Sequence, residues 1–303
     1  MGHFRKLIKK ALPHFVVKNY QYLSSRVSHA ILHAPGGFYS PIPSKGEIKR
    51  YNFNVPLPET LPGIDLNTNE QLNLLDSFEA FYKELPFSDK KSEGLRYYFG
   101  ENIAYCYSDA ILLYCMIRHL KPKKIIEVGS GFSSCVTLDT NEKFMGNSIN
   151  CIFIEPYPKT LESLLKDNDK EHVTIHKKRL QEIPLGVFEE LQENDILFID
   201  STHVVKFNSD VNYVFREILP ALAHGVYIHF HDVFYPFEYP KEWLLDGIAW
   251  NEQYMLRTFL QYNNDFKIVL FNTYLESMYE SQIKNRFPLL YKNTGGSIWI
   301  KKI

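Results

Sequence analysis

One turn constrains the fold of this chain more than any other feature of its sequence. Residues 124–134 read KIIEVGSGFSS, an apolar strand that runs into a glycine turn. Gly129 and Gly131 permit positive φ angles and a close approach of the backbone to a ligand, next to the helix that we expect from Ser133. Such a strand, turn and helix are typical of a nucleotide-type cofactor site at the open edge of a parallel sheet.

Short apolar runs alternate with helical periodicity after about residue 95. Helical segments separate the first five runs, whereas no crossover helix of sufficient regularity is evident between the last two. The pattern predicts an α/β fold: a doubly wound, mostly parallel, Rossmann-like seven-stranded sheet that ends in an antiparallel hairpin. We predict strands over Ile125–Val128, Cys151–Ile154, His172–His176, Ile196–Ile199, Gly225–Phe230, Phe266–Phe271 and Gly296–Ile303.

We place a domain boundary near residue 95, between an accessory region (1–95) and the main domain (96–303). Proline, glycine and aromatic residues crowd Pro35–Pro62, which excludes a helix interior or a central strand and predicts a wrapping loop. Its Gly37–Pro43 segment is a candidate wall for a substrate. An accessory helix is expected over Asn69–Leu85, and Ser108 and Asp109 should cap the helix that precedes the first strand.

The segment before Glu47 is basic, because it contains lysines and arginines but no acidic residue. It predicts an amphipathic helix with two alternative roles. The helix could make weak peripheral contact with anionic lipid, or it could pack on its own domain or on a second subunit. The second alternative would make the protein a homo-oligomer, and the sequence does not decide between the two.

Composition and charge limit the classes of binding partner and the location that we expect. A net charge of −1 and a pI near 6.8 argue against nucleic acid and favour a small or sugar-like partner. The four cysteines lie in apolar segments without Cys-x-x-Cys spacing, so we expect reduced core thiols and a cytoplasmic location. No apolar run reaches the roughly 18–20 residues of a transmembrane segment.

Four acidic residues stand at or next to the ends of predicted strands: Glu127, Glu155, Asp200 and Asp232. Glu127 can accept hydrogen bonds from a ligand ammonium, and Glu155 is placed to bind two ribose hydroxyls. NAD sites also use such an acid, but they favour Gly-x-Gly-x-x-Gly, and here the third glycine position is Ser134. The terminal hairpin, which is expected of class I methyltransferases, favours S-adenosylmethionine over NAD.

Asp200 and Asp232 should lie side by side, and neighbouring carboxylates must share a proton, a cation or a basic group. One alternative is Mg²⁺ or another divalent cation held by this pair. The other is proton transfer with His203 or His231 as general base, while His229 is expected to be a packing residue. Two histidines and one carboxylate can also hold iron, which would make the protein a metal-dependent oxygenase.

Three segments carry a resemblance to a known family: IEVGSGFSS (126–134), FIDSTH (198–203) and HFHDVF (229–234). They resemble class I S-adenosylmethionine-dependent methyltransferases, in particular the family 24 type related to bacterial sugar and polysaccharide modification. The resemblance implies transfer of a methyl group to a hydroxyl of a small acceptor, a sugar or a glycan precursor. Aromatic residues between Phe234 and Trp250 are candidates for holding that acceptor.

The resemblance also implies roles for individual residues. Catechol-type O-methyltransferases place Asp-Asn after the fifth strand, where this chain has His231-Asp232, and this departure leaves metal dependence open. The expected catalytic residues are Asp200, His203, His231 and Asp232. The expected cofactor-binding residues are Glu127, Gly129, Ser130, Gly131, Ser133, Ser134, Glu155 and Asp200.

Overall fold

The computed structural model describes residues 33, 35–100, 102 and 104–303. They form two compact units. One comprises the described residues up to Val55 together with Lys241–Ala249, and the other comprises Pro56–Pro240 and Trp250–Ile303. The predicted basic N-terminal helix lies outside the described residues, so its lipid contact stays a prediction. No helix in the described part of the chain is long and apolar enough to cross a membrane.

The smaller unit contains two short helices, α3 (Lys45–Arg50) and α11 (Lys241–Leu245). A capping box begins α3, because the Glu47 N–H donates to Oγ of Ser44 and the Ser44 N–H donates to Oε2 of Glu47. Residues 35–43 form turns and bends without helix or strand, as their prolines and glycines predict. The loop prediction for Pro35–Pro62 is wrong over Lys45–Arg50, because this proline-free stretch forms α3.

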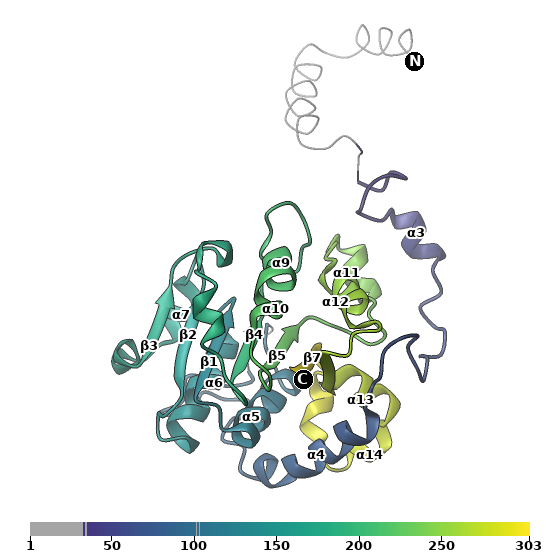
Figure 1. Ribbon diagram of the computed structural model, residues 1–303. Coiled ribbons are helices and arrows are strands. Elements are labelled where there is room, and N and C mark those ends of the chain that lie inside the picture. Colours follow the sequence, from purple (N-terminus) through teal and green to yellow (C-terminus); the bar gives the residue numbers. More distant parts are fainter. Residues whose placement is uncertain (1–32, 34, 101, 103) are drawn as a thin grey trace, which may run out of the picture. The chain divides into compact units, whose positions relative to one another are not determined.

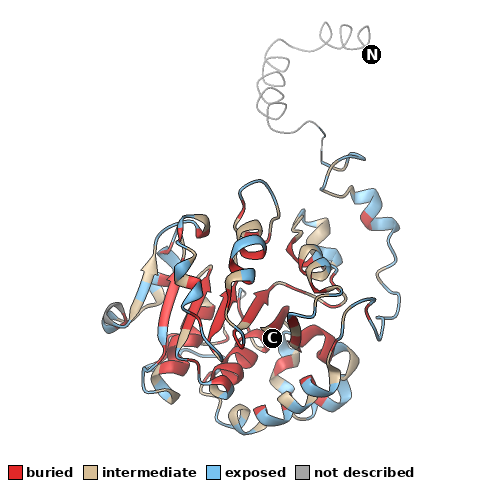
Figure 2. Cartoon of the chain, in the orientation of Figure 1, coloured by how far each residue is buried: buried red, intermediate tan, exposed pale blue. Residues whose placement is uncertain are grey.

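The larger unit is built on a seven-stranded sheet of order β3-β2-β1-β4-β5-β7-β6 (Figure 1). The first five strands are parallel, and β7 runs antiparallel to both β5 and β6. The central strands are buried (Figure 2), which explains their continuous apolar sequences. The predicted sheet with its terminal antiparallel hairpin is thus confirmed. The strands are β1 (Lys124–Val128), β2 (Asn150–Ile154), β3 (Val173–His176), β4 (Ile196–Ile199), β5 (Tyr227–His231), β6 (Phe266–Phe271) and β7 (Ser297–Lys302).

The connection between β6 and β7 differs from the prediction. It is helical where no crossover helix was expected, because it is divided into three pieces too short to show a clear period. These are α13 (Asn272–Met278), α14 (Glu280–Lys284) and the 3₁₀ helix η4 (Pro288–Lys292). Pro288 opens the last piece, where its missing N–H costs no helical hydrogen bond.

Helices connect the parallel strands. One of them is continuous from Asp210 to Ala221 but contains a π-helical stretch, so its pieces are α9 (Asp210–Tyr213), η3 (Val214–Ile218) and α10 (Leu219–Ala221). The α-helices not yet given are α4 (Thr68–Lys83), α5 (Ser108–Leu120), α6 (Phe132–Phe144), α7 (Lys159–Leu164), α8 (Gly186–Glu189) and α12 (Glu252–Leu260). The short 3₁₀ helices are η1 (Asp167–Glu171) and η2 (Leu180–Glu182).

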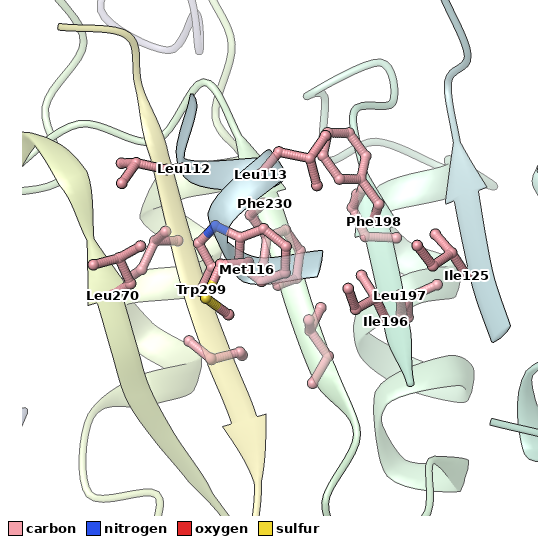
Figure 3. Packing of buried hydrophobic residues seen from close by; sticks show 14 of the residues in the cluster. Leu112, Leu113, Met116, Ile125, Ile196, Leu197, Phe198, Phe230, Leu270 and Trp299 are labelled. Carbon is pink, nitrogen blue, oxygen red and sulfur yellow. The ribbon is translucent and has the colours of Figure 1, made fainter. Parts of the chain in front are cut away.

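One hydrophobic cluster joins α5 to the sheet. Met116 of α5 belongs to the same buried cluster as Phe198 of β4, Phe230 of β5 and Trp299 of β7 (Figure 3). All four cysteines are buried and unpaired, as predicted. The anchored strands give the carboxyl edge of the sheet a rigid base.

A buried arginine ties the segment before α5 to α6 and η1. The guanidinium of Arg96 donates to Asp169 through Nε at 2.7 Å and to Asp139 through Nη1 at 2.7 Å. Asp139 also accepts the backbone N–H groups of Arg96 and Tyr97. Because both partners are buried with it, the charge of Arg96 is compensated inside the protein.

Candidate functional site

The carboxyl ends of the parallel strands bring the four predicted acids to one edge of the sheet. Glu127 is the fourth residue of β1, while Glu155, Asp200 and Asp232 directly follow β2, β4 and β5. β1 pairs with β2 on one side and with β4 on the other, and β4 also pairs with β5. This is the edge at which doubly wound sheets bind ligands.

The glycine turn passes close to the end of β4. Gly129 has φ +80°, and its N–H donates to the Ile154 carbonyl at 3.0 Å. A Cβ atom at this position would lie 1.6 Å from the Asp200 carbonyl oxygen, so only glycine fits. Gly131, by contrast, has φ −175°. The turn therefore uses the positive φ that glycine permits at Gly129 only, and the chain is extended where it enters α6.

Two serines of α6 hold Glu127. Oγ of Ser133 and Oγ of Ser134 donate to Oε1 of Glu127 at 2.5 and 2.9 Å, and the Gly131 N–H donates to Oγ of Ser134 at 3.1 Å. Burial raises the pKa of Glu127 to about 8, although the two hydroxyls oppose this shift. Oε2 of Glu127 and Oγ of Ser130 are buried and have no hydrogen-bond partner among the described residues. Unsatisfied buried polar atoms at such a turn mark a place where a ligand can supply partners.

A cavity of about 400 Å³ opens beside this turn. Its lining includes Gly129, Glu155, Gln181, Asp200 and Ser201. Oε1 of Glu155 accepts the Tyr157 N–H at 2.8 Å, and Oε2 lies 3.4 Å from the N–H of Ser130. The carboxylate is therefore fixed at the cavity wall and keeps lone pairs for further donors.

Beyond the cavity, two aspartates and two histidines surround one point. Oδ1 of Asp200 lies 3.2 Å from Nε2 of His203 and 3.4 Å from Nδ1 of His231. Oδ2 of Asp232 lies 3.5 Å from each of the same two nitrogens. The prediction that Asp200 and Asp232 lie close together is confirmed, and both histidines lie beside them. We call these four residues the Asp/His cluster.

The backbone is strained at two members of the cluster. His203 and Asp232 both have φ +57°, a left-handed conformation that is unfavourable for residues other than glycine. Each follows a strand end closely, and the turn aims its side chain at the partner from the other strand. Left-handed non-glycine residues are enriched at functional sites, where surrounding contacts hold them.

Two further carboxylates, which the sequence did not single out as site residues, contact the outer nitrogens of the histidines. Oε2 of Glu252 lies 2.9 Å from Nδ1 of His203, and Oδ2 of Asp109 lies 3.5 Å from Nε2 of His231. Asp109 was expected to cap α5 together with Ser108. That prediction is wrong, because Tyr107 is the N-cap and both side chains are buried. Glu252 lies 49 positions from His203 in the sequence, so packing between distant segments brings the two side chains together.

The charges within the cluster are strongly coupled. Burial disfavours ionisation of Asp200, yet the charge of His231 and the hydrogen bond and charge of His203 outweigh it and hold the pKa of Asp200 well below its usual range. Burial likewise opposes protonation of His203, but hydrogen bonds to Asp200 and Glu252 raise its pKa to about 10. His231 has a raised pKa for the same kind of reason, with Asp232 as its main partner. The His203 imidazole is therefore protonated at neutral pH, and the nearby carboxylates likewise favour the protonated form of His231.

His229 takes no part in the cluster. Its ring stacks on Phe198 with centroids 4.1 Å apart and contacts Trp299 at 4.7 Å. Burial lowers its pKa, so it is a neutral residue of the core, as expected.

The cluster offers donor atoms for a metal ion. One donor atom each from Asp200, His231 and Asp232 lies within 4.8 Å of the others. Nδ1 of His231 is buried and has no hydrogen-bond partner among the described residues, although carboxylate oxygens of Asp200 and Asp232 lie 3.4 and 3.5 Å away. Carboxylate oxygens and an imidazole nitrogen are ligands that a divalent cation can use.

Several solved structures are similar to this chain. The O-methyltransferase TomG from Streptomyces achromogenes, in complex with SAM, is 16% identical, with 76% of this chain and 88% of TomG covered and a TM-score of 0.45. A methyltransferase from Thermobifida fusca described as putative is 14% identical, with 64% and 81% covered and a TM-score of 0.42. The Mg-SAM form of CmcI is 16% identical, with 82% and 89% covered and a TM-score of 0.41.

Sequence comparison identifies a relative and a family. An uncharacterized protein of Archaeoglobus fulgidus is 34% identical over 168 residues, which cover 54% of this chain and 75% of the relative. The profile of a family described as "Methyltransferase domain" matches residues 126–233. The matched segment runs from β1 to the residue after Asp232, so it contains the glycine turn and all four strand-end acids.

Proposed function

Because this chain belongs to the methyltransferase family whose domain matches residues 126–233, we propose that it transfers a methyl group from S-adenosylmethionine to a hydroxyl of a small acceptor, a sugar or a glycan precursor. One observation carries the proposal. The cavity beside the Gly129 turn is bounded by Glu155 and reaches Asp200, which also belongs to the Asp/His cluster. Asp200 would therefore belong both to the site for the methyl donor and to the residues that handle the proton.

The residues around the turn fit S-adenosylmethionine, which supplies a methyl group activated on a sulfonium. Glu155 would accept hydrogen bonds from the two ribose hydroxyls with the lone pairs that its backbone contacts leave free. The methionine end would be held by Oε2 of Glu127, Oγ of Ser130 and the Gly129 backbone, together with Gly131, Ser133, Ser134 and Asp200. Two of these atoms are buried without partners, which suits a ligand that brings donors and acceptors.

The Asp/His cluster handles the proton that the acceptor hydroxyl loses. Positioning the hydroxyl in line with the methyl group provides most of the acceleration. His203, His231 or Asp232 then removes the proton, and His203 is the strongest candidate because its Nε2 lies 3.2 Å from Asp200, which lines the cavity. The nearby carboxylates raise the pKa of His203 to about 10, so Nε2 already carries a proton. Nε2 can act as a base only when another positive charge neutralises the aspartates and lowers this pKa.

A divalent cation fits the same cluster through Asp200 and Asp232, with His231 as a further ligand. Such a cation, Mg²⁺ or another, supplies positive charge that orients an acceptor hydroxyl and lowers its pKa. The residues of this chain would then divide the work, with the aspartates holding the ion and His203 moving the proton.

Aromatic side chains near the cluster suit a sugar ring. The Trp250 ring lies 4.4 Å from the His203 ring, and Tyr239 lies 6.3 Å from Trp250. The Gly37–Pro43 segment belongs to the other compact unit, and its role as an acceptor wall stays a prediction. We place the reaction in the cytoplasm because reduced cysteines are usual there. The oxygenase alternative is not favoured, because the family match is to methyltransferases.

Calorimetric titration with S-adenosylmethionine tests the proposal. The wild type should bind it, and Glu155→Gln should weaken binding at least about tenfold through the lost ribose hydrogen bonds. Glu190→Gln is the matched control, since Glu190 pairs with Lys124 at the opposite edge of the sheet. Transfer of a radiolabelled methyl group to a panel of sugars and nucleotide sugars then identifies the acceptor. No binding by the wild type would overturn the proposal.

A further inference from the structure

We infer that Glu252 is a positioning residue that holds His203 in its working orientation. The expected effect on catalysis rests on the proposed function. The structural evidence is the set of contacts between the start of α12 and His203. Glu252 is the first residue of α12 and is 1% exposed. Its Oε2 lies 2.9 Å from Nδ1 of His203, the length of a strong charge-assisted hydrogen bond.

The start of α12 clamps the loop that carries His203 through several bonds. The backbone N–H groups of Asn251 and Glu252 donate to the His203 carbonyl at 3.0 and 3.1 Å. Oδ1 of Asn251 accepts the Val205 N–H at 2.6 Å. These contacts explain how His203 keeps its left-handed φ of +57°, and they place α12 behind the imidazole.

The side-chain contact selects which imidazole nitrogen faces the reaction. With Nδ1 bonded to Glu252, Nε2 is the nitrogen that lies 3.2 Å from Asp200 and 3.5 Å from Asp232. A flipped ring would turn Nδ1 away from Glu252 and leave a buried carboxylate without a partner, which is costly. The Trp250 ring, 4.4 Å away, restricts the imidazole further.

Glu252 differs from a carboxylate that only stabilises the fold. Among the described residues its side chain has one hydrogen-bond partner, His203, while its Oε1 is buried and unpaired. Asp109, behind His231, instead accepts hydrogen bonds from Asn272 and the Gly296 N–H, and these anchor the turn before β7. Burying a carboxylate costs folding free energy, and one hydrogen bond to a histidine compensates only part of that cost. Carboxylates paired with a single histidine typically fix the orientation of the imidazole at functional sites.

Two variants and one control test the inference. Glu252→Gln should lower kcat about 10- to 100-fold, the range typical of residues that orient a working histidine. Its Kd for S-adenosylmethionine should stay within about twofold of the wild type, because Glu252 does not line the cavity. In a His203→Ala background, Glu252→Gln should cause no further loss, since residues that act as a unit are not additive. Additive losses, or a fully active Glu252→Gln enzyme, would overturn the inference.

A spectroscopic measurement separates this inference from the proposed function. The wild type should show a far-downfield, slowly exchanging imidazole proton resonance from Nδ1–H of His203, and this signal should disappear in Glu252→Gln and in His203→Ala. Glu276→Gln is the control, because Glu276 is also a buried glutamate with one unpaired oxygen but contacts Ser108. Absence of the resonance in the wild type would contradict the positioning role even if methyl transfer is found. Its presence in a protein that does not bind S-adenosylmethionine would contradict the proposed function alone.

Discussion

The Cα of Gly129 lies so close to the end of β4 that a Cβ atom there would meet the carbonyl oxygen of Asp200 at 1.6 Å. The glycine at position 129 therefore does more than permit a positive φ, because it lets the turn pass directly against Asp200, a member of the Asp/His cluster. Gly129→Ala should push these two chain segments apart. We expect S-adenosylmethionine binding to be lost and the protein to be destabilised, which titration and chemical denaturation can measure.

Gly94 supplies the control for this prediction. Its φ is +78°, nearly the same as the +80° of Gly129, but a Cβ atom there would have no neighbour within 4 Å. Gly94→Ala should therefore show only the backbone cost, about 1–2 kcal/mol. Gly129→Ala should cost at least about 1–3 kcal/mol more, the usual price of overpacking. Equal losses in the two variants would mean that the turn can move away from Asp200.

Glu127 should make stability depend on pH. Burial raises its pKa from 4.5 to about 8 in the folded protein, so between these values the folded state keeps a proton that the unfolded state has lost. The stabilising contribution is complete below pH 4.5 and is lost as the pH rises through 8, with a slope of up to about 1.4 kcal/mol per pH unit. Glu127→Gln should remove this slope. Denaturation of both proteins from pH 5 to pH 8 gives the difference curve, and a flat difference would show that Glu127 is ionised in the fold.

The sheet could be predicted from sequence because its strands are buried on both faces. Each predicted strand is present with its ends within a residue or two, and Ile196–Ile199 matches β4. The Asp/His cluster was predictable for a related reason. In a parallel sheet, residues that directly follow neighbouring strands must meet at one edge, so Asp200 and Asp232 could be placed together without coordinates.

The supporting residues could not be predicted in this way. Glu252 reaches His203 across 49 positions, and Asp109 reaches His231 from the first turn of α5. Both contacts depend on how helices pack against the sheet, which no local pattern encodes. The helices between β6 and β7 were missed because α13 and α14 are too short to show a clear apolar period.

Arg96 should contribute strongly to stability. It is 6% exposed, and Arg96→Met would leave Asp139 and Asp169 without their main counter-charge in the interior. Breaking a buried ion pair by removing one partner typically costs about 3–5 kcal/mol. Chemical denaturation should show a loss in this range. Arg179→Met is the control, since Arg179 pairs with Glu182 on the surface, and a loss no larger than that of the control would mean that water compensates the carboxylates.

A measurement of metal binding by the Asp/His cluster tests directly whether Asp232 is a metal ligand. Donor atoms of Asp200, His231 and Asp232 lie within 4.8 Å of one another, so we expect the wild type to bind Mn²⁺ or Mg²⁺. Asp232→Asn should weaken binding at least about tenfold, whereas Glu155→Gln, at the same sheet edge, should leave it unchanged. Affinity should rise with pH, because the pKa of His231 is raised and its proton must leave before Nδ1 can bind an ion. Titration calorimetry at two pH values measures both effects. Failure of the wild type to bind either ion, with methyl transfer intact in EDTA, would mean that the protonated histidines alone balance the aspartates.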